Sequence, residues 1–152
     1  MQIAARLVLL WLLAALSQIA WGQPSVKPSA EDVQRFLASI ELHTAAELAE
    51  AMQRAEHLHL EARADGRMLE PIAFVLHGPE VISLLAPNYE KNMKLVDMAE
   101  RLVASEYIDL KVCQRWMGGN GIDPAQLPPF IGTVPYGAAE IERLMTQDYV
   151  YF

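Results

Sequence analysis

The chain has 152 residues, of which 53% are hydrophobic and 20% are charged, a balance that excludes intrinsic disorder and fits one domain of ordinary size. It contains 12 Lys and Arg against 19 Asp and Glu, for a net charge of −7. This acidic balance argues against nucleic-acid binding, which needs basic patches. The single cysteine excludes an internal disulfide framework and any multi-cysteine zinc or iron–sulfur centre.

The first 22 residues have the pattern of a secretory signal peptide. Arg6 precedes the unbroken apolar run 7–16 (LVLLWLLAAL), and the small residues Ala20 and Gly22 form a cleavage site. We therefore predict cleavage after Gly22 and a periplasmic or secreted protein without stable membrane insertion. The alternative is an uncleaved membrane anchor, since residues 3–21 are just long enough to span a bilayer.

Between this signal and the domain, residues 23–35 are expected to form a leader or linker, because 23–29 (QPSVKPS) holds two prolines and two serines. Ser29-Ala-Glu-Asp32 has the form of a capping box, which indicates a short helical turn through about Arg35. The folded domain is then expected over residues 36–152.

The first part of the domain predicts a strand followed by a long helix. Residues 36–42 (FLASIEL) are expected in the strand, and the capping box Thr44-Ala-Ala-Glu47 opens a helix that runs to about Ala64. The apolar positions of this helix recur at helical spacing, at Leu48, Met52, Ala55 and Leu58.

The middle of the domain predicts two strands around a second helix. The short apolar run 72–76 (IAFVL) is typical of a buried strand, and the alternating run 108–113 (IDLKVC) is typical of a half-buried one. The helix between them is expected over 89–105. Its apolar face is expected to carry Met93, Val96, Leu102 and Val103.

The last third predicts a short helix or turn and a loop over 114–122, a strand over 130–134 (FIGTV), a helix over 138–146 and a final strand over 149–152 (YVYF). The last helix is expected to turn inward Ile141, Leu144 and Met145. Strands that alternate with helices predict an α/β domain with a mainly parallel sheet and helices on both of its faces.

Three chemically useful side chains stand where predicted strands end. His43 follows the first strand, His77 closes the second and Cys113 closes the third. Because ligands of open parallel sheets bind at the carboxyl ends of the strands, we expect all three along one edge. Two imidazoles and a thiol are also a donor set for zinc with one open position, so a metal-binding module is one hypothesis.

Each of these residues has a functional and a structural interpretation. Cys113 stands just before a predicted helix start and two residues before Arg115, and both features favour the thiolate, which is the reactive form of cysteine. The alternative is a free cysteine that is buried for packing. His77 either orients a ligand and tunes Cys113, or bonds to backbone at the end of its strand. His43 either joins them or is an ordinary surface histidine before a helix cap.

Other patterns are weaker. Residues 56–61 (EHLHLE) look like metal ligands, but His57 and His59 are two positions apart on a helix and do not face each other, so a solvated face is expected. The sequence has no C-x-x-C, nucleophile elbow, P-loop or dinucleotide-binding pattern. Gly119 stands six residues after Cys113, where a phosphatase or rhodanese-type loop has arginine.

In their order and spacing, the segments from Ile72 to Phe152 resemble the DsrE/DsrF-like superfamily of small sulfur-relay proteins. The matching pieces are a strand ending in His77-Gly78-Pro79, a strand ending in Val112-Cys113, Gly121-Ile122-Asp123-Pro124, the turn Thr133-Val134-Pro135-Tyr136-Gly137, a helix of the form Ala-Glu-Ile-x-x-Leu over 139–144, and an aromatic last strand.

This resemblance implies a three-layer α/β/α fold whose five-stranded parallel sheet has the order 4-3-2-1-5, which places His77 beside Cys113. It implies that Cys113 accepts sulfane sulfur as a persulfide and passes it on, with a protein or a small sulfur compound as donor and acceptor and with no resident cofactor. Family members often form trimers or hexamers, so a homo-oligomer is expected.

The leading hypothesis is therefore an exported sulfur carrier. Cys113 is its acceptor thiol, Arg115 helps to poise the thiolate, and His77 is a neighbouring acid/base or ligand-orienting group. One competing hypothesis is a non-catalytic oligomeric binding or assembly protein of the same fold, with a structural Cys113. The other is the metal-binding module of His43, His77 and Cys113.

Overall fold

The computed structural model describes residues 34–152. The predicted signal peptide and the capping box at Ser29 lie outside the described residues. Arg35, the last residue of the predicted leader, already belongs to the first strand, where its guanidinium binds the Glu70 carboxylate (Nε to Oε2, 2.9 Å). The first strand therefore begins one residue earlier than predicted, and the helical turn predicted to reach Arg35 is wrong at that end.

Five strands alternate with the helices along the chain. The strands are β1 (Arg35–Leu37), β2 (Ile72–Leu76), β3 (Ile108–Cys113), β4 (Gly132–Val134) and β5 (Tyr149–Tyr151). The α-helices are α1 (Ala45–Ala64), α2 (Tyr89–Ala104), α3 (Gln114–Gly119) and α4 (Gly137–Met145). Short 3-10 helices are η2 (Pro79–Leu84), η3 (Ala86–Asn88) and η4 (Pro124–Gln126). The sequence did not predict η2 and η3, which fill the connection from β2 to α2.

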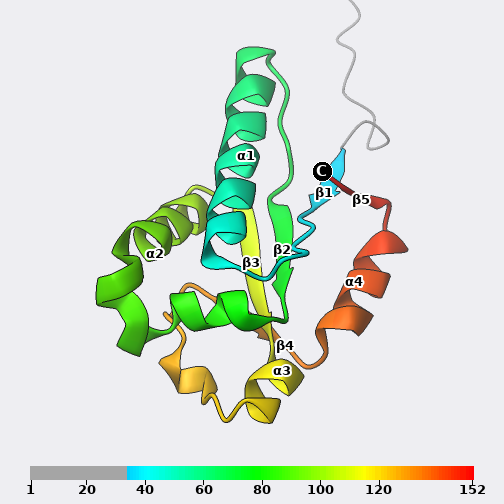
Figure 1. Cartoon of the computed structure of the whole chain (residues 1–152). Coiled ribbons are helices and arrows are strands. Elements are labelled where there is room, and N and C mark those ends of the chain that lie inside the picture. The colour runs from blue at the N-terminus through cyan, green and yellow to red at the C-terminus, as the bar shows by residue number, and fades with distance from the viewer. Residues whose placement is uncertain (1–33) are drawn as a thin grey trace, which may run out of the picture. The chain divides into compact units, whose positions relative to one another are not determined.

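The strands form one sheet with the order β4-β3-β2-β1-β5, and all four pairings are parallel (Figure 1). This is the α/β fold that the residue patterns predicted, with the strand order that the resemblance implied. The longest pairing joins β2 and β3, from Ile72 opposite Ile108 to Leu76 opposite Val112. All five residues of β2 are buried, as expected for a central strand with cover on both faces.

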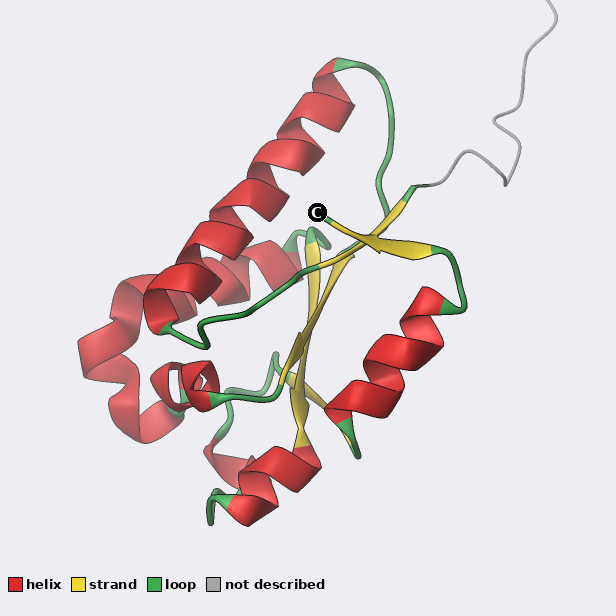
Figure 2. Cartoon of the chain, turned by 45° about the vertical axis from the view of Figure 1, so that its right-hand side comes forward, coloured by secondary structure: helices red, strands yellow, loops and turns green. Residues whose placement is uncertain are grey.

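The two faces of the sheet are covered unequally. The main core packs α1, η2 and α2 against one face, through Ile72, Phe74 and Leu76 of β2 and the matching residues of β3. The other face is covered by α4 (Figure 2), in a smaller cluster with Val75 and Leu144 among its members. The fold is therefore a three-layer α/β/α arrangement with a thick layer and a thin one.

The first strand is shorter than predicted, because the chain after Leu37 turns to cap α1. Thr44 is the N-cap, and its hydroxyl accepts a hydrogen bond from the Glu47 amide (3.1 Å). The Glu47 carboxylate reaches back and accepts from the amides of Glu41 (2.7 Å) and Leu42 (2.8 Å). These amides serve the helix cap, so residues 38–42 do not extend the strand.

Three smaller predictions are also corrected. The fourth strand begins at Gly132, because the Ile131 amide closes a turn onto the Pro128 carbonyl (3.0 Å). Met93 and Met145 are exposed. Each methionine lies outside the buried face of its helix, and in α4 that face includes Leu144. Among residues 34–152, no helix has both the length and the apolar composition that crossing a membrane requires.

Candidate functional site

The carboxyl edge of the sheet brings Cys113 and His77 together, as the strand order predicts. Cys113 ends β3, and His77 follows β2 in the paired register that places Leu76 opposite Val112. Gly137, at the start of α4, lies over both residues. A Cβ atom on Gly137 would be 3.2 Å from Cys113 Cβ and 3.3 Å from His77 Cβ. Glycine thus lets the backbone of α4 approach the cysteine and the histidine closely.

That close approach gives the Cys113 sulfur two backbone donors. The Gly137 amide donates to Sγ at 3.2 Å and the Trp116 amide donates to it at 3.4 Å. Cys113 is only 3% exposed. Two N–H groups directed at one sulfur atom stabilise negative charge on it, because hydrogen bonds to a charged acceptor are stronger than those to a neutral one.

Cys113 lines a pocket of about 410 Å³. Its walls come from the carboxyl ends of β2 and β3, from α3 and from the start of α4. The lining residues are His77, Cys113, Arg115, Trp116, Gly119, Asn120, Tyr136 and Ala138. Arg115 lies with its guanidinium carbon 5.1 Å from the centre of the Tyr136 ring, and its amide donates to the Pro135 carbonyl (3.2 Å). The structure therefore places all three predicted site residues, Cys113, His77 and Arg115, on one pocket.

A buried carboxylate stands behind His77, and the sequence analysis missed it. Glu80 is 1% exposed; its Oε1 accepts from the amides of His77 (3.1 Å) and Gly78 (3.0 Å). Its Oε2 lies 2.8 Å from Nδ1 of His43. An acidic residue that stands directly before the apolar run 81–85 (VISLL) was the signal that could have indicated a buried, partnered carboxylate.

His43 belongs to this network and is not an ordinary surface histidine. Its backbone has a φ of 53°, in the left-handed region that few residues other than glycine adopt. Its ring centre lies 5.1 Å from that of His77, with the planes inclined at 60°. Gly78 makes room for it, since a Cβ there would overlap the His43 ring and lie 2.6 Å from Glu80 Oε2. The edge thus holds two imidazoles, one carboxylate and one thiol.

The geometry does not support the metal-binding hypotheses. Within residues 34–152, no three His, Cys, Asp or Glu side chains are grouped so that they could hold a metal ion. Glu80 already occupies the Nδ1 atom of His43.

The interpretation of residues 56–61 as a solvated face is wrong for His59. This side chain is buried and stacks on the Tyr107 ring, with centres 4.5 Å apart and planes at 3°. His57 is exposed, with Nε2 3.1 Å from the Glu61 carboxylate. Burial lowers the pKa of His59; a hydrogen bond to the Tyr107 backbone opposes this shift, and the charge of Arg63 adds to it.

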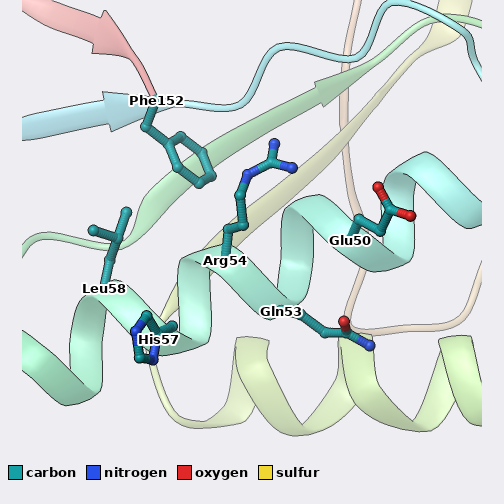
Figure 3. Close-up of a pocket in the computed structure, with 6 residues that line it drawn as sticks. All are labelled: Glu50, Gln53, Arg54, His57, Leu58 and Phe152. Atoms are coloured by element: carbon teal, nitrogen blue, oxygen red, sulfur yellow. The ribbon is translucent and has the colours of Figure 1, made fainter.

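A second hollow, of about 650 Å³, lies along α1 where the last residue of the chain packs against it. In Figure 3 the Phe152 ring extends from the end of β5 over α1 and lies beside Arg54, whose guanidinium carbon is 5.6 Å from the ring centre. The other lining residues are Glu50, Gln53, His57 and Leu58. This hollow is larger than the thiol pocket, but no thiol lines it, so the smaller pocket is the candidate site.

No family model matches the sequence, and no curated protein matches it. Among solved structures, the chain is similar to a protein of unknown function, MTH1491 from Methanobacterium thermoautotrophicum, with a TM-score of 0.56 and 17% identity. The match covers 79% of this chain and 96% of that chain. At this identity the likeness concerns the fold alone, and it agrees with the α/β architecture described above.

Proposed function

We propose that this protein is an exported sulfur carrier of the DsrE/DsrF-like type, in which Cys113 accepts a sulfane sulfur as a persulfide and passes it to another thiol. One observation carries the proposal: Cys113 lines a pocket together with His77, and its sulfur accepts two backbone N–H groups at 3.2 and 3.4 Å. The resemblance of residues 72–152 to that superfamily supports the same assignment.

The reaction requires a thiolate on Cys113 and a neighbouring group that takes up and returns a proton. Cys113–S⁻ attacks the outer sulfur of a donor persulfide RSSH; a new S–S bond forms on Sγ, the donor S–S bond breaks, and RS⁻ leaves. The products are Cys113–S–SH and RS⁻, so charge and atoms balance. In this proposal His77, which lines the same pocket, takes the thiol proton before the attack and returns a proton to RS⁻. Transfer to an acceptor thiol is the same exchange in the opposite sense.

The test is intact-protein mass spectrometry of the purified protein after treatment with polysulfide, which carries sulfane sulfur, with Cys113→Ser as the control. We expect a gain of about one sulfur mass in the wild type, removed by reductant and absent from the variant. The mass of protein recovered from an exporting host also reports whether residues 1–22 have been removed. A wild-type protein that gains no sulfur under these conditions contradicts the carrier function.

The burial of Cys113 favours a second candidate, a non-catalytic binding or assembly protein in which the cysteine is structural. At 3% exposure the thiol has the accessibility of a core residue. On this alternative, an alkylating agent labels Cys113 only after denaturation. On the sulfur-carrier proposal, an alkylating agent labels Cys113 in the folded protein.

A further inference from the structure

The thiol pocket is positively charged in a chain that is otherwise acidic. The protein has a net charge of −7, yet none of the residues that line the pocket is Asp or Glu, and Arg115 is one of them. The ion pairs formed within residues 34–152 employ Arg35, Arg67, Arg101 and Arg143 but not Arg115. Its guanidinium rests on the Tyr136 ring, so its N–H groups stay available to a ligand.

We infer that the sulfur donor is a small anion, the persulfide of a carboxylate-bearing low-molecular-weight thiol such as an amino acid or a short peptide. Arg115 binds the carboxylate, while the sulfane sulfur reaches Cys113. This inference rests on the proposed sulfur-carrier function and adds the class of donor. Arg115 thereby determines specificity, in addition to the poising of the thiolate predicted from the sequence.

The shape of the site favours a small donor over the surface of a folded protein. Cys113 is 3% exposed, so the donor sulfur has to enter the pocket to meet Sγ. A volume of about 410 Å³ lies in the range of about 300–1,000 Å³ that is typical of small-molecule sites. Trp116 and Tyr136 supply apolar wall for the carbon chain of the donor, and Arg115 supplies the charge.

The transfer follows the balanced exchange given above. The Cys113 thiolate attacks the outer sulfur of the donor, and the donor leaves as a thiolate that still carries its carboxylate. Arg115 does not take part in bond making. Its guanidinium holds the donor where the attack on the outer sulfur is in line, and it also favours a leaving group that carries two negative charges.

The experiment compares three persulfides of similar size, made from 3-mercaptopropionate (anionic), 2-mercaptoethanol (neutral) and cysteamine (cationic). Single-turnover loading of Cys113 is followed by mass spectrometry in the wild type, Arg115→Gln and Arg115→Lys. The matched control is Arg67→Gln, which loses the same charge from an exposed ion pair with Asp65 (3.1 Å). Circular dichroism verifies that each variant is folded.

The measured quantity is the ratio of the loading rates with the anionic and the cationic donor. We expect this ratio to be about tenfold higher in the wild type than in Arg115→Gln, which is the factor that one charge-assisted hydrogen bond supplies. Arg115→Lys and Arg67→Gln keep most of that preference, and added salt reduces it in the wild type. Equal preference in the wild type and Arg115→Gln, with the neutral donor still loading Cys113, overturns this inference alone. Failure of all three donors to load the wild type overturns the proposed function.

Discussion

His43 at the carboxyl end of the sheet and His59 near its amino end lie in different environments. At the carboxyl end, Nδ1 of His43 lies 2.8 Å from the buried Glu80 carboxylate, and the centre of the His43 ring lies 5.1 Å from that of the His77 ring. Near the amino end, His59 lies flat on Tyr107, and its Nε2 finds no hydrogen-bond partner within residues 34–152. The first histidine is fixed by polar partners, and the second by aromatic packing.

The difference indicates where chemistry is built into the molecule. A carboxylate that binds one ring nitrogen fixes the tautomer and orientation of a histidine, as acid/base work requires. Glu80 also accepts from the amides of His77 and Gly78, so one buried side chain organises the turn after β2. A stacked histidine without such a partner adds buried aromatic surface to the core. Its protonation destabilises the folded state, because the charge is then buried without a partner.

The largest effect is expected from Glu80→Ala. The substitution removes the acceptor of two backbone amides and of the His43 ring, so we expect a loss of about 3 kcal/mol in the free energy of unfolding, in the range measured when buried charged partners are removed. The matched control is Glu61→Ala, which breaks the exposed contact with His57 and is expected to cost less than about 0.5 kcal/mol. Urea denaturation measures both. Equal losses would show that the Glu80 network is no more than a surface contact.

An intermediate effect is expected from Gly78→Ala, which leaves Glu80 in place and disturbs His43. The new methyl group overlaps the His43 ring and lies 2.6 Å from Glu80 Oε2, so we expect His43 to be displaced at a cost of about 2 kcal/mol.

Gly118→Ala is the control for that substitution. Gly118 lies in α3, and a Cβ there has nothing within 4 Å. Alanine is expected to stabilise this helix by about 0.5–1 kcal/mol. NMR of the histidine rings distinguishes the two variants, because only Gly78→Ala is expected to shift His43. Unchanged His43 resonances in Gly78→Ala would mean that the ring does not lie against the turn in solution.

Sequence patterns were sufficient for the scaffold and for part of the site. The apolar run 72–76 and the alternating run 108–113 predicted the bounds of β2 and β3 correctly. A strand buried on both faces is apolar throughout, and a strand buried on one face alternates apolar and polar residues. Once the order of strands and helices along the chain is known, the shared carboxyl edge of His43, His77 and Cys113 follows. That His77 lies directly beside Cys113 followed from the strand order that the resemblance implies.

The rest of the site depends on contacts between residues far apart in the chain. Nothing local pairs Glu80 with His43, because the two are 37 positions apart. Gly137 is the donor to a sulfur 24 residues away. Likewise, His59 looks solvated beside its charged neighbours, and only the Tyr107 ring, contributed just before β3, shows that this side of α1 is covered. Tertiary contacts, and not periodicity, determine these environments.

The smallest effect, and the one that best separates the two histidines, concerns pH. An unfolded chain protonates His59 near 6.5, whereas burial lowers the pKa of this residue in the fold. Below pH 6.5 the unfolded state therefore binds more protons, so the contribution of His59 to stability is present above that pH and is lost as the pH falls toward the folded-state pKa.

The substitution His59→Phe tests this directly. Phenylalanine keeps the stack on Tyr107 and removes both the unpartnered nitrogen and the titration. We expect the stability of the variant relative to the wild type to rise as the pH is lowered through 6.5, measured by urea denaturation at several pH values. Leu60→Phe, on the exposed side of the same helix, is the control and should differ from the wild type by a constant amount. A constant difference for His59→Phe as well would mean that His59 is protonated as readily in the fold as in the unfolded chain, and the contrast between the two ends of the sheet would then lie in geometry alone.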